Sequence, residues 1–168
     1  MASVLKVDQL QGVSNANNVI VPGAIIQTQV GYVTAWTTTT SYALVSTGLA
    51  VTITPKFNTS NVLITIALNG VYTQEAAHYV RIHLYKGGSN LSGISTAHGQ
   101  ALASSSNETE YATGLSTVYL DSPATTSATT YKLQIRGDNT NSPLKINRYS
   151  ETNDYYGVST LTLREVSA

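Results

Sequence analysis

Residues 115–137 read LSTVYLDSPATTSATTYKLQIRG and contain two stretches in which apolar and polar residues alternate. A period of two is typical of a β-strand that buries one face. Pro123 and a run of small Ser, Thr and Ala residues separate the stretches and predict an exposed turn. The segment therefore predicts an antiparallel strand pair. Its apolar residues are expected to point into the core: Val118, Leu120, Tyr131, Leu133 and Ile135.

Length and charge limit what this pair can belong to. The chain has 168 residues, which suits one main domain, and its formal net charge is zero with 11% charged residues. Such a surface offers no electrostatic footprint for nucleic acid or for an anionic membrane. Without cysteine there is no disulfide framework and no thiolate metal site. We expect neither a secretory leader nor membrane insertion, because no apolar run of the required length is present.

Residues 1–22 differ in texture from the rest and are expected to form an N-terminal anchoring arm before a sandwich domain at 23–168. Two short apolar patches flank a middle rich in Gly, Ser and Asn, and neither can form a stable structure alone. The alternatives are a disordered tail and a segment ordered by docking on another chain; spaced apolar residues favour docking. The anchoring residues would be Val4, Leu5, Val7, Val19, Ile20 and Val21.

The whole chain reads as short strands separated by turns. In residues 24–36, Ile26, Val30 and Tyr32 share one face of a long strand. Further strands are predicted at 42–45, 49–53, 62–72, 79–85, 91–97, 144–148 and 158–166. About ten strands and no helical stretch predict an all-β antiparallel β-sandwich, jelly-roll-like, with an extended N-terminal arm. An up-and-down barrel is the alternative, and the absence of a repeat disfavours a propeller or solenoid.

Titratable residues give no pattern of an active site. His78 and His83 are five residues apart on a strand, which places them on opposite faces. His98 stands alone in a small-residue loop, and Glu108 and Glu110 are better explained as solvated charges than as a glycosidase pair. No phosphate loop, nucleophile elbow or zinc motif occurs. We expect no enzymatic activity, no cofactor and no metal.

One strand face is unusually aromatic. In residues 79–85, Val80, Ile82 and Leu84 alternate with residues that would point outward. Tyr and Arg are enriched in subunit interfaces, so the outward row predicts one; an ordinary exposed face and a ligand contact are the alternatives. The predicted interface residues are Tyr79, Arg81, His83 and Tyr85.

A loop at 147–157 combines three tyrosines with Asn, Asp and Arg. Flat apolar ring faces beside planar hydrogen-bonding groups are the chemistry of sugar recognition. The alternative is that the tyrosines pin the loop to the sandwich. The predicted glycan-contact residues are Asn147, Arg148, Tyr149, Asn153, Asp154, Tyr155 and Tyr156.

The run TVYLDSPATTSATTYKLQIRG, with STGLAVTITPKFNTSNVLITIALNG and RIHLYKGGSNL before it, resembles a domain of tailed bacteriophages, including cyanophages, that usually ends tail-fibre or tail-fibre-like proteins. The start, ASVLKVDQLQGVSNANNVIVPG, is similar to a short leader of phage structural proteins. The resemblance implies a virion structural protein, commonly trimeric, with the arm anchoring and the sandwich outward. Neither heptads nor a β-helical repeat supplies the shaft of a long fibre.

Three functions follow as hypotheses. The first is a short tail or baseplate fibre component that contacts host surface glycans through its loops. The second is a capsid decoration or cement protein that trimerises on the head, and the third is a free-standing carbohydrate-binding jelly roll. For a virion protein the expected partners are copies in a homotrimer, other virion proteins through residues 1–22, and a host surface polysaccharide; neither nucleic acid nor a membrane is expected. The expected location is the virion, assembled in the host cytoplasm.

Overall fold

The computed structural model describes residues 21–40, 42–73, 78–91, 100–103, 111–137, 143–149 and 156–168. Every regular element in this part of the chain is a β-strand. In chain order the strands are β1 (Ile25–Val33), β2 (Thr37–Thr39), β3 (Val45–Ile53), β4 (Asn61–Thr73), β5 (His78–Lys86), β6 (Ser89–Asn90), β7 (Gln100–Ala103), β8 (Tyr111–Asp121), β9 (Thr129–Arg136), β10 (Leu144–Ile146) and β11 (Ser159–Val166). Residues 1–20 lie outside the described residues, so the anchoring arm stays a prediction.

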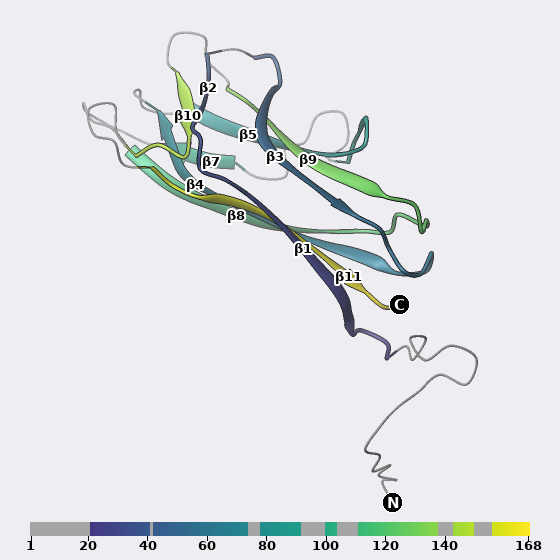
Figure 1. Ribbon diagram of the computed structural model, residues 1–168. Coiled ribbons are helices and arrows are strands. Elements are labelled where there is room, and N and C mark those ends of the chain that lie inside the picture. Colours follow the sequence, from purple (N-terminus) through teal and green to yellow (C-terminus); the bar gives the residue numbers. More distant parts are fainter. Residues whose placement is uncertain are drawn as a thin grey trace, which may run out of the picture.

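The strands form two antiparallel sheets packed face to face (Figure 1). If the short β2, β6 and β10 are left out, sheet A has the order β1-β11-β4-β8 and sheet B the order β3-β9-β5-β7. Consecutive strands such as β3 and β4, or β8 and β9, lie in different sheets rather than side by side. This eight-stranded crossing pattern is that of a jelly roll, which confirms the predicted fold class and excludes an up-and-down barrel.

The core lies between the sheets and is supplied by alternate residues of each strand. β11 has a strictly alternating burial pattern, and β9 and β3 nearly so. Full burial of one aliphatic side chain contributes roughly 1.5–3 kcal/mol, so this double layer dominates the stability of the fold. The buried apolar side chains include Leu49, Ile53, Val62, Ile64, Ile66, Leu68, Ile82, Leu84, Tyr131, Leu133, Ile135, Leu161 and Leu163.

The pair predicted over 115–137 is not a hairpin. β8 pairs with β4 in sheet A, whereas β9 pairs with β3 and β5 in sheet B, so residues 122–128 cross between the sheets. Tyr131, Leu133 and Ile135 are fully buried, as expected. The prediction for β8 is wrong, because Val118 and Leu120 are 59% and 56% exposed. β8 carries apolar residues on both faces, and it is Tyr119, with Leu115, that packs against the core.

β1 is a long strand, as predicted, and the face that carries Val30 and Tyr32 points to solvent. Val30 and Tyr32 share a face and are 58% and 72% exposed. The register shifts between Ile25 and Gln27, a β-bulge that changes which residues point inward. Gly31 then faces sheet B, where an added Cβ would lie 2.5 Å from Val51 Cγ2. β1 can therefore approach β3 this closely only with glycine at that position.

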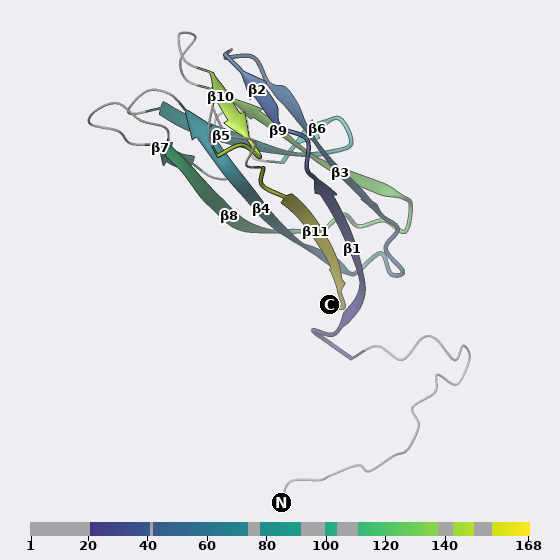
Figure 2. The same ribbon diagram turned by 60° about the vertical axis from the view of Figure 1, so that its left-hand side comes forward.

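The chain enters and leaves the sandwich at the same end. Gly23 N donates to Ser167 O at 3.0 Å, and Ser167 N donates to Ala24 O at 3.0 Å. Nearby, the buried Glu165 accepts hydrogen bonds from Lys56 N at 2.8 Å and Gln27 Nε2 at 2.6 Å. β2 and β10 lie at the opposite end of the sandwich in both views (Figures 1 and 2). The two ends of the molecule are thus built from different parts of the chain.

Candidate functional site

The end of the sandwich that carries β10 is organised by Asn147. This residue has a φ of 62° and is 1% exposed. Its Nδ2 donates to the carbonyl oxygens of Val33 at 3.1 Å and Ala35 at 2.9 Å, and Ser159 Oγ donates to its Oδ1. The prediction that Asn147 contacts a glycan is therefore wrong. It is a buried positioning residue that joins the chain after β10 to the end of β1 and to the start of β11.

A glycine in β4 holds the next residue in place. Arg148 N donates to Gly70 O at 3.0 Å, and Gly70 has a φ of 54°. An added Cβ at Gly70 would lie 2.6 Å from Arg148 N, so the two backbones approach closely because there is no side chain between them. The position of Arg148 is thus set by the backbone of a core strand. A site built on such an element is more rigid than one on a free loop.

Two cations lie over aromatic rings at this end. Lys145 Nζ is 5.6 Å from the ring centroid of Trp36 and 5.6 Å from that of Tyr72. Arg148 Cζ is 5.1 Å from the Trp36 centroid. Each contact is worth roughly 0.5–2 kcal/mol, more where water is excluded, and Lys145 is 7% exposed. We call Trp36, Tyr72, Lys145 and Arg148 the cation–aromatic cluster.

Two tyrosines of the predicted glycan loop flank this cluster. Tyr149 follows Arg148 directly, and Tyr156 forms an isolated bridge with Arg148. Both tyrosines are exposed, as is Trp36 at 43%. Aromatic rings beside a guanidinium can stack on a sugar ring and hydrogen-bond a hydroxyl or carboxylate. The predicted contacts Asn153, Asp154 and Tyr155 lie outside the described residues.

Sequence reasoning missed Trp36 and Lys145 as members of this site. They are far apart along the chain and are brought together because β10 pairs with both β2 and β4. The signal that was available is composition, since Trp36 is the single tryptophan of the chain and directly precedes a short polar strand. A single exposed tryptophan close to a lysine on a neighbouring strand indicates a candidate binding site.

The sequence predicts a subunit interface on the outward face of β5, through Tyr79, Arg81, His83 and Tyr85. The side chain of Tyr79 lies outside the described residues. His83 is 5% exposed, with its Nδ1 3.3 Å from Asn90 Nδ2, so it is covered within its own chain. This corrects the expectation that His83 faces a partner. Arg81 and Tyr85 are half-buried, and Lys132 Nζ lies 5.8 Å from the Tyr85 ring. The interface stays a prediction.

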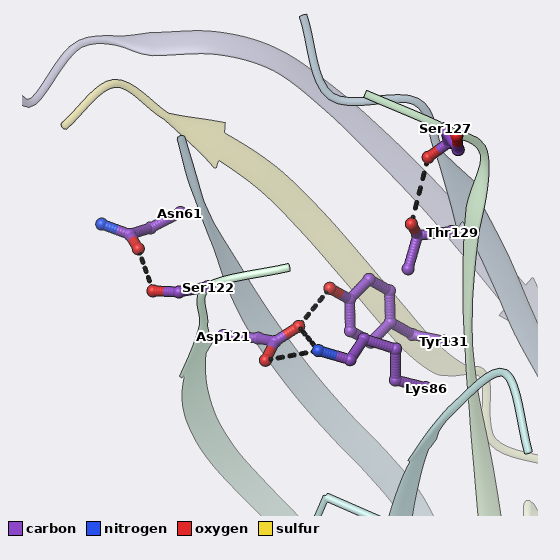
Figure 3. Close-up of polar contacts among 7 residues, drawn as sticks. All are labelled: Asn61, Lys86, Asp121, Ser122, Ser127, Thr129 and Tyr131. Carbon is purple, nitrogen blue, oxygen red and sulfur yellow. Dashed lines mark hydrogen bonds and ion pairs between the residues drawn. The ribbon is translucent and has the colours of Figure 1, made fainter. Parts of the chain in front are cut away.

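A polar contact joins the two sheets at the C-terminal end of β8, which is Asp121 (Figure 3). Asp121 accepts a hydrogen bond from Tyr131 OH at 2.6 Å and pairs with Lys86 Nζ at 2.9 Å. Burial, and then the Asp121 hydrogen bond, raise the pKa of Tyr131 well above its usual range. The carboxylate is buried but paired from two sides, so this group is a structural clasp between β8, β9 and β5.

The described residues contain no group of three or more His, Cys, Asp or Glu side chains that could hold a metal ion. Within the same part of the chain, no helix has the length and apolar character needed to cross a membrane.

No family model and no curated protein matches this chain. Among solved structures, that of infectious bursal disease virus, Gx strain, is similar over all of this chain and 43% of that chain, with a TM-score of 0.38 and 11% identity. T=1 particles derived from infectious bursal virus give a TM-score of 0.43 at 11% identity, over all of this chain and 41% of that chain. This chain thus spans about two fifths of the length of those it matches. The assignment of the jelly roll follows from the strand order of the two sheets.

Proposed function

We propose that this chain is a non-enzymatic structural protein of a phage virion, a short tail or baseplate fibre-like component held by its N-terminal arm. The observation that carries the proposal is the placement of the two ends. Residues 21–24 leave the sandwich beside Ser167, while β2 and β10, beside which the cation–aromatic cluster is built, lie at the far end of the same jelly roll (Figure 1). An anchor at one end and an aromatic, cationic surface at the other suit a protein that is fixed to a particle and reaches outward.

The sequence and the fold support this proposal in different ways. The resemblance of residues 117–137 and of the leader to phage structural proteins points to a virion. Jelly rolls are common in capsid and lectin domains, but a fold alone does not define a function. Val21, where the arm meets the sandwich, is an exposed apolar residue. Its side chain is available to bind another virion protein.

Imaging of purified particles tests the location. Particles of the phage that encodes this chain would be labelled with an antibody raised against the full chain and viewed by electron microscopy. Label on the tail or baseplate is expected. Label spread over the head would contradict the tail or baseplate location and support a capsid decoration protein. Particles without label would contradict a virion role.

At the outward end we propose contact with a host surface polysaccharide through Arg148, Tyr149 and Tyr156. A glycan array with the full chain tests it, and Arg148→Ala should weaken binding at least tenfold, or about 1.4 kcal/mol. Lys132→Ala is the matched control, because Lys132 also lies over an aromatic ring but on sheet B. The absence of binding to any glycan at millimolar concentration would count against this contact.

A second candidate is a capsid decoration protein, and one observation favours it. The outer face of sheet A exposes apolar side chains from both β1 and β8, which suits lateral packing on a flat protein lattice. The labelling experiment separates the two candidates. A protein absent from particles that still binds glycans would instead be a free-standing carbohydrate-binding jelly roll.

A further inference from the structure

The outer face of sheet A is a flat surface with apolar flanks. Strand register aligns its residues in rows across β1, β11, β4 and β8. The three rows are Thr28-Arg164-Leu63-Leu120, Val30-Thr162-Thr65-Val118 and Tyr32-Thr160-Ala67-Ser116. The side strands supply the most exposed apolar groups, Val30 and Tyr32 on one flank and Val118 and Leu120 on the other. We call these the β1 flank and the β8 flank.

Charge is nearly absent from this face. Arg164 is the one charged residue in the three rows, and it lies in the row nearest the arm, with Nη1 3.4 Å from Thr65 Oγ1. The middle strands otherwise present threonine, alanine and leucine. Because the whole chain has zero formal net charge, two copies meet without long-range repulsion. Apart from Arg164, the rows of this face can pack against a second copy without burying a charge.

The outer face of sheet B has a different character. Its rows include Ser46-Gln134-His83 and Ala50-Lys132-Tyr85. Among the side chains of β3, β9 and residues 81–86 of β5, no large apolar side chain is as exposed as those of the two flanks. Tyr85, the aromatic residue of the predicted β5 interface whose side chain is described, is half-buried, whereas the apolar residues on the flanks of sheet A are exposed. This contrast favours the outer face of sheet A over that of sheet B as a surface for association.

We propose that copies of this chain associate through the outer face of sheet A, with the β1 flank of one copy against the β8 flank of its neighbour. A rotation axis parallel to the strands produces this contact and keeps the arms of all copies at the same end. It places Val30 of one copy opposite Val118 of the next, since both lie in the central row. Aligned sheets pack in this way at about 10 Å separation.

The size of the face limits how much surface the contact can bury. Four strands at about 4.8 Å spacing and seven residues at about 3.3 Å rise give a footprint of roughly 440 Å². A stacked pair would cover roughly 900 Å² in total, at the low end of specific interfaces. Association in dilute solution is therefore weak. Copies held side by side on a particle by their arms would be at a much higher effective concentration.

Cysteine crosslinking tests the contact directly, because the chain has no cysteine of its own. The variant with Val30→Cys and Val118→Cys carries two thiols that lie about 14 Å apart within one copy, three strand spacings, which is too far for an internal disulfide. Oxidation of the full chain should give disulfide-linked dimers on a non-reducing gel. Adding Leu120→Glu to the same variant should reduce the crosslinked fraction at least tenfold.

The matched control is Val30→Cys with Ala50→Cys, since Ala50 is exposed on the outer face of sheet B. The contact is contradicted if this control crosslinks as well as the Val30→Cys, Val118→Cys variant, or if neither crosslinks at 100 μM chain. It is also contradicted if Val30→Cys alone crosslinks equally well, because that result would place like flanks together. Circular dichroism of each reduced variant verifies folding, and all substituted positions are exposed strand residues.

Discussion

Tyr131 and Asp121 join the two sheets through a single short contact. The phenol is fully buried and donates to the carboxylate at 2.6 Å, while Lys86 reaches the same carboxylate from its half-exposed strand end. A hydrogen bond to a charged group contributes roughly 1.5–3 kcal/mol. Its loss leaves Asp121 buried with one partner fewer. At the scale of single residues, this clasp makes the stability of the fold sensitive to alkaline pH.

Tyr131→Phe should lower the free energy of unfolding by about 2 kcal/mol at pH 8. In the wild type, the pKa of Tyr131 is raised by burial and by Asp121, so the folded chain keeps a proton that the unfolded chain loses above about pH 10. The stabilisation is complete below that pH and falls above it by up to about 1.4 kcal/mol per pH unit. The difference between wild type and variant should therefore shrink between pH 8 and pH 11, as measured by urea unfolding.

The control for this prediction is Tyr32→Phe, at a tyrosine that is 72% exposed. It should change the unfolding free energy little at either pH. A wild-type advantage over Tyr131→Phe that is equally large at pH 8 and pH 11 would show that Tyr131 ionises as freely in the folded chain as in the unfolded one.

At the scale of elements, the sequence predicts strands well and their partners poorly. Alternation predicts β4, β5, β9 and β11, because each has one strongly apolar face. It predicts the wrong face for β8, where Val118 and Leu120 on one side compete with Leu115 and Tyr119 on the other. Local pattern also cannot reveal that β8 and β9 lie in different sheets. That arrangement depends on pairing with strands far away in sequence.

The candidate site shows the same limit. Composition is sufficient to find Arg148, Tyr149 and Tyr156, because tyrosine and arginine in a polar loop are a local signal. It gives Asn147 the wrong role, since whether an asparagine is buried depends on carbonyl groups supplied by β1 and the residues after it. Lys145 is missed because its aromatic neighbours come from β4 and from the segment before β2. A local sequence pattern cannot reveal a site whose residues are brought together by strand pairing over long distances in the sequence.

At the scale of the whole molecule, three surfaces divide the work that we propose. The arm leaves beside the C-terminal strand, the cation–aromatic cluster lies at the far end, and the outer face of sheet A runs between them (Figure 2). Under these proposals, the long axis of the jelly roll separates anchoring from contact with the host, and lateral association uses the side of the molecule. This division requires that residues 1–22 carry the attachment to the particle.

Deletion of residues 2–20 tests that requirement most directly, because it leaves the described sandwich intact from Val21 onward. The full chain and the deletion variant would each be mixed with particles lacking the protein and sedimented, with circular dichroism to verify that both are folded. The full chain should sediment with the particles, and the deletion variant should stay in the supernatant. A folded deletion variant that sediments as well as the full chain would contradict anchoring through the arm.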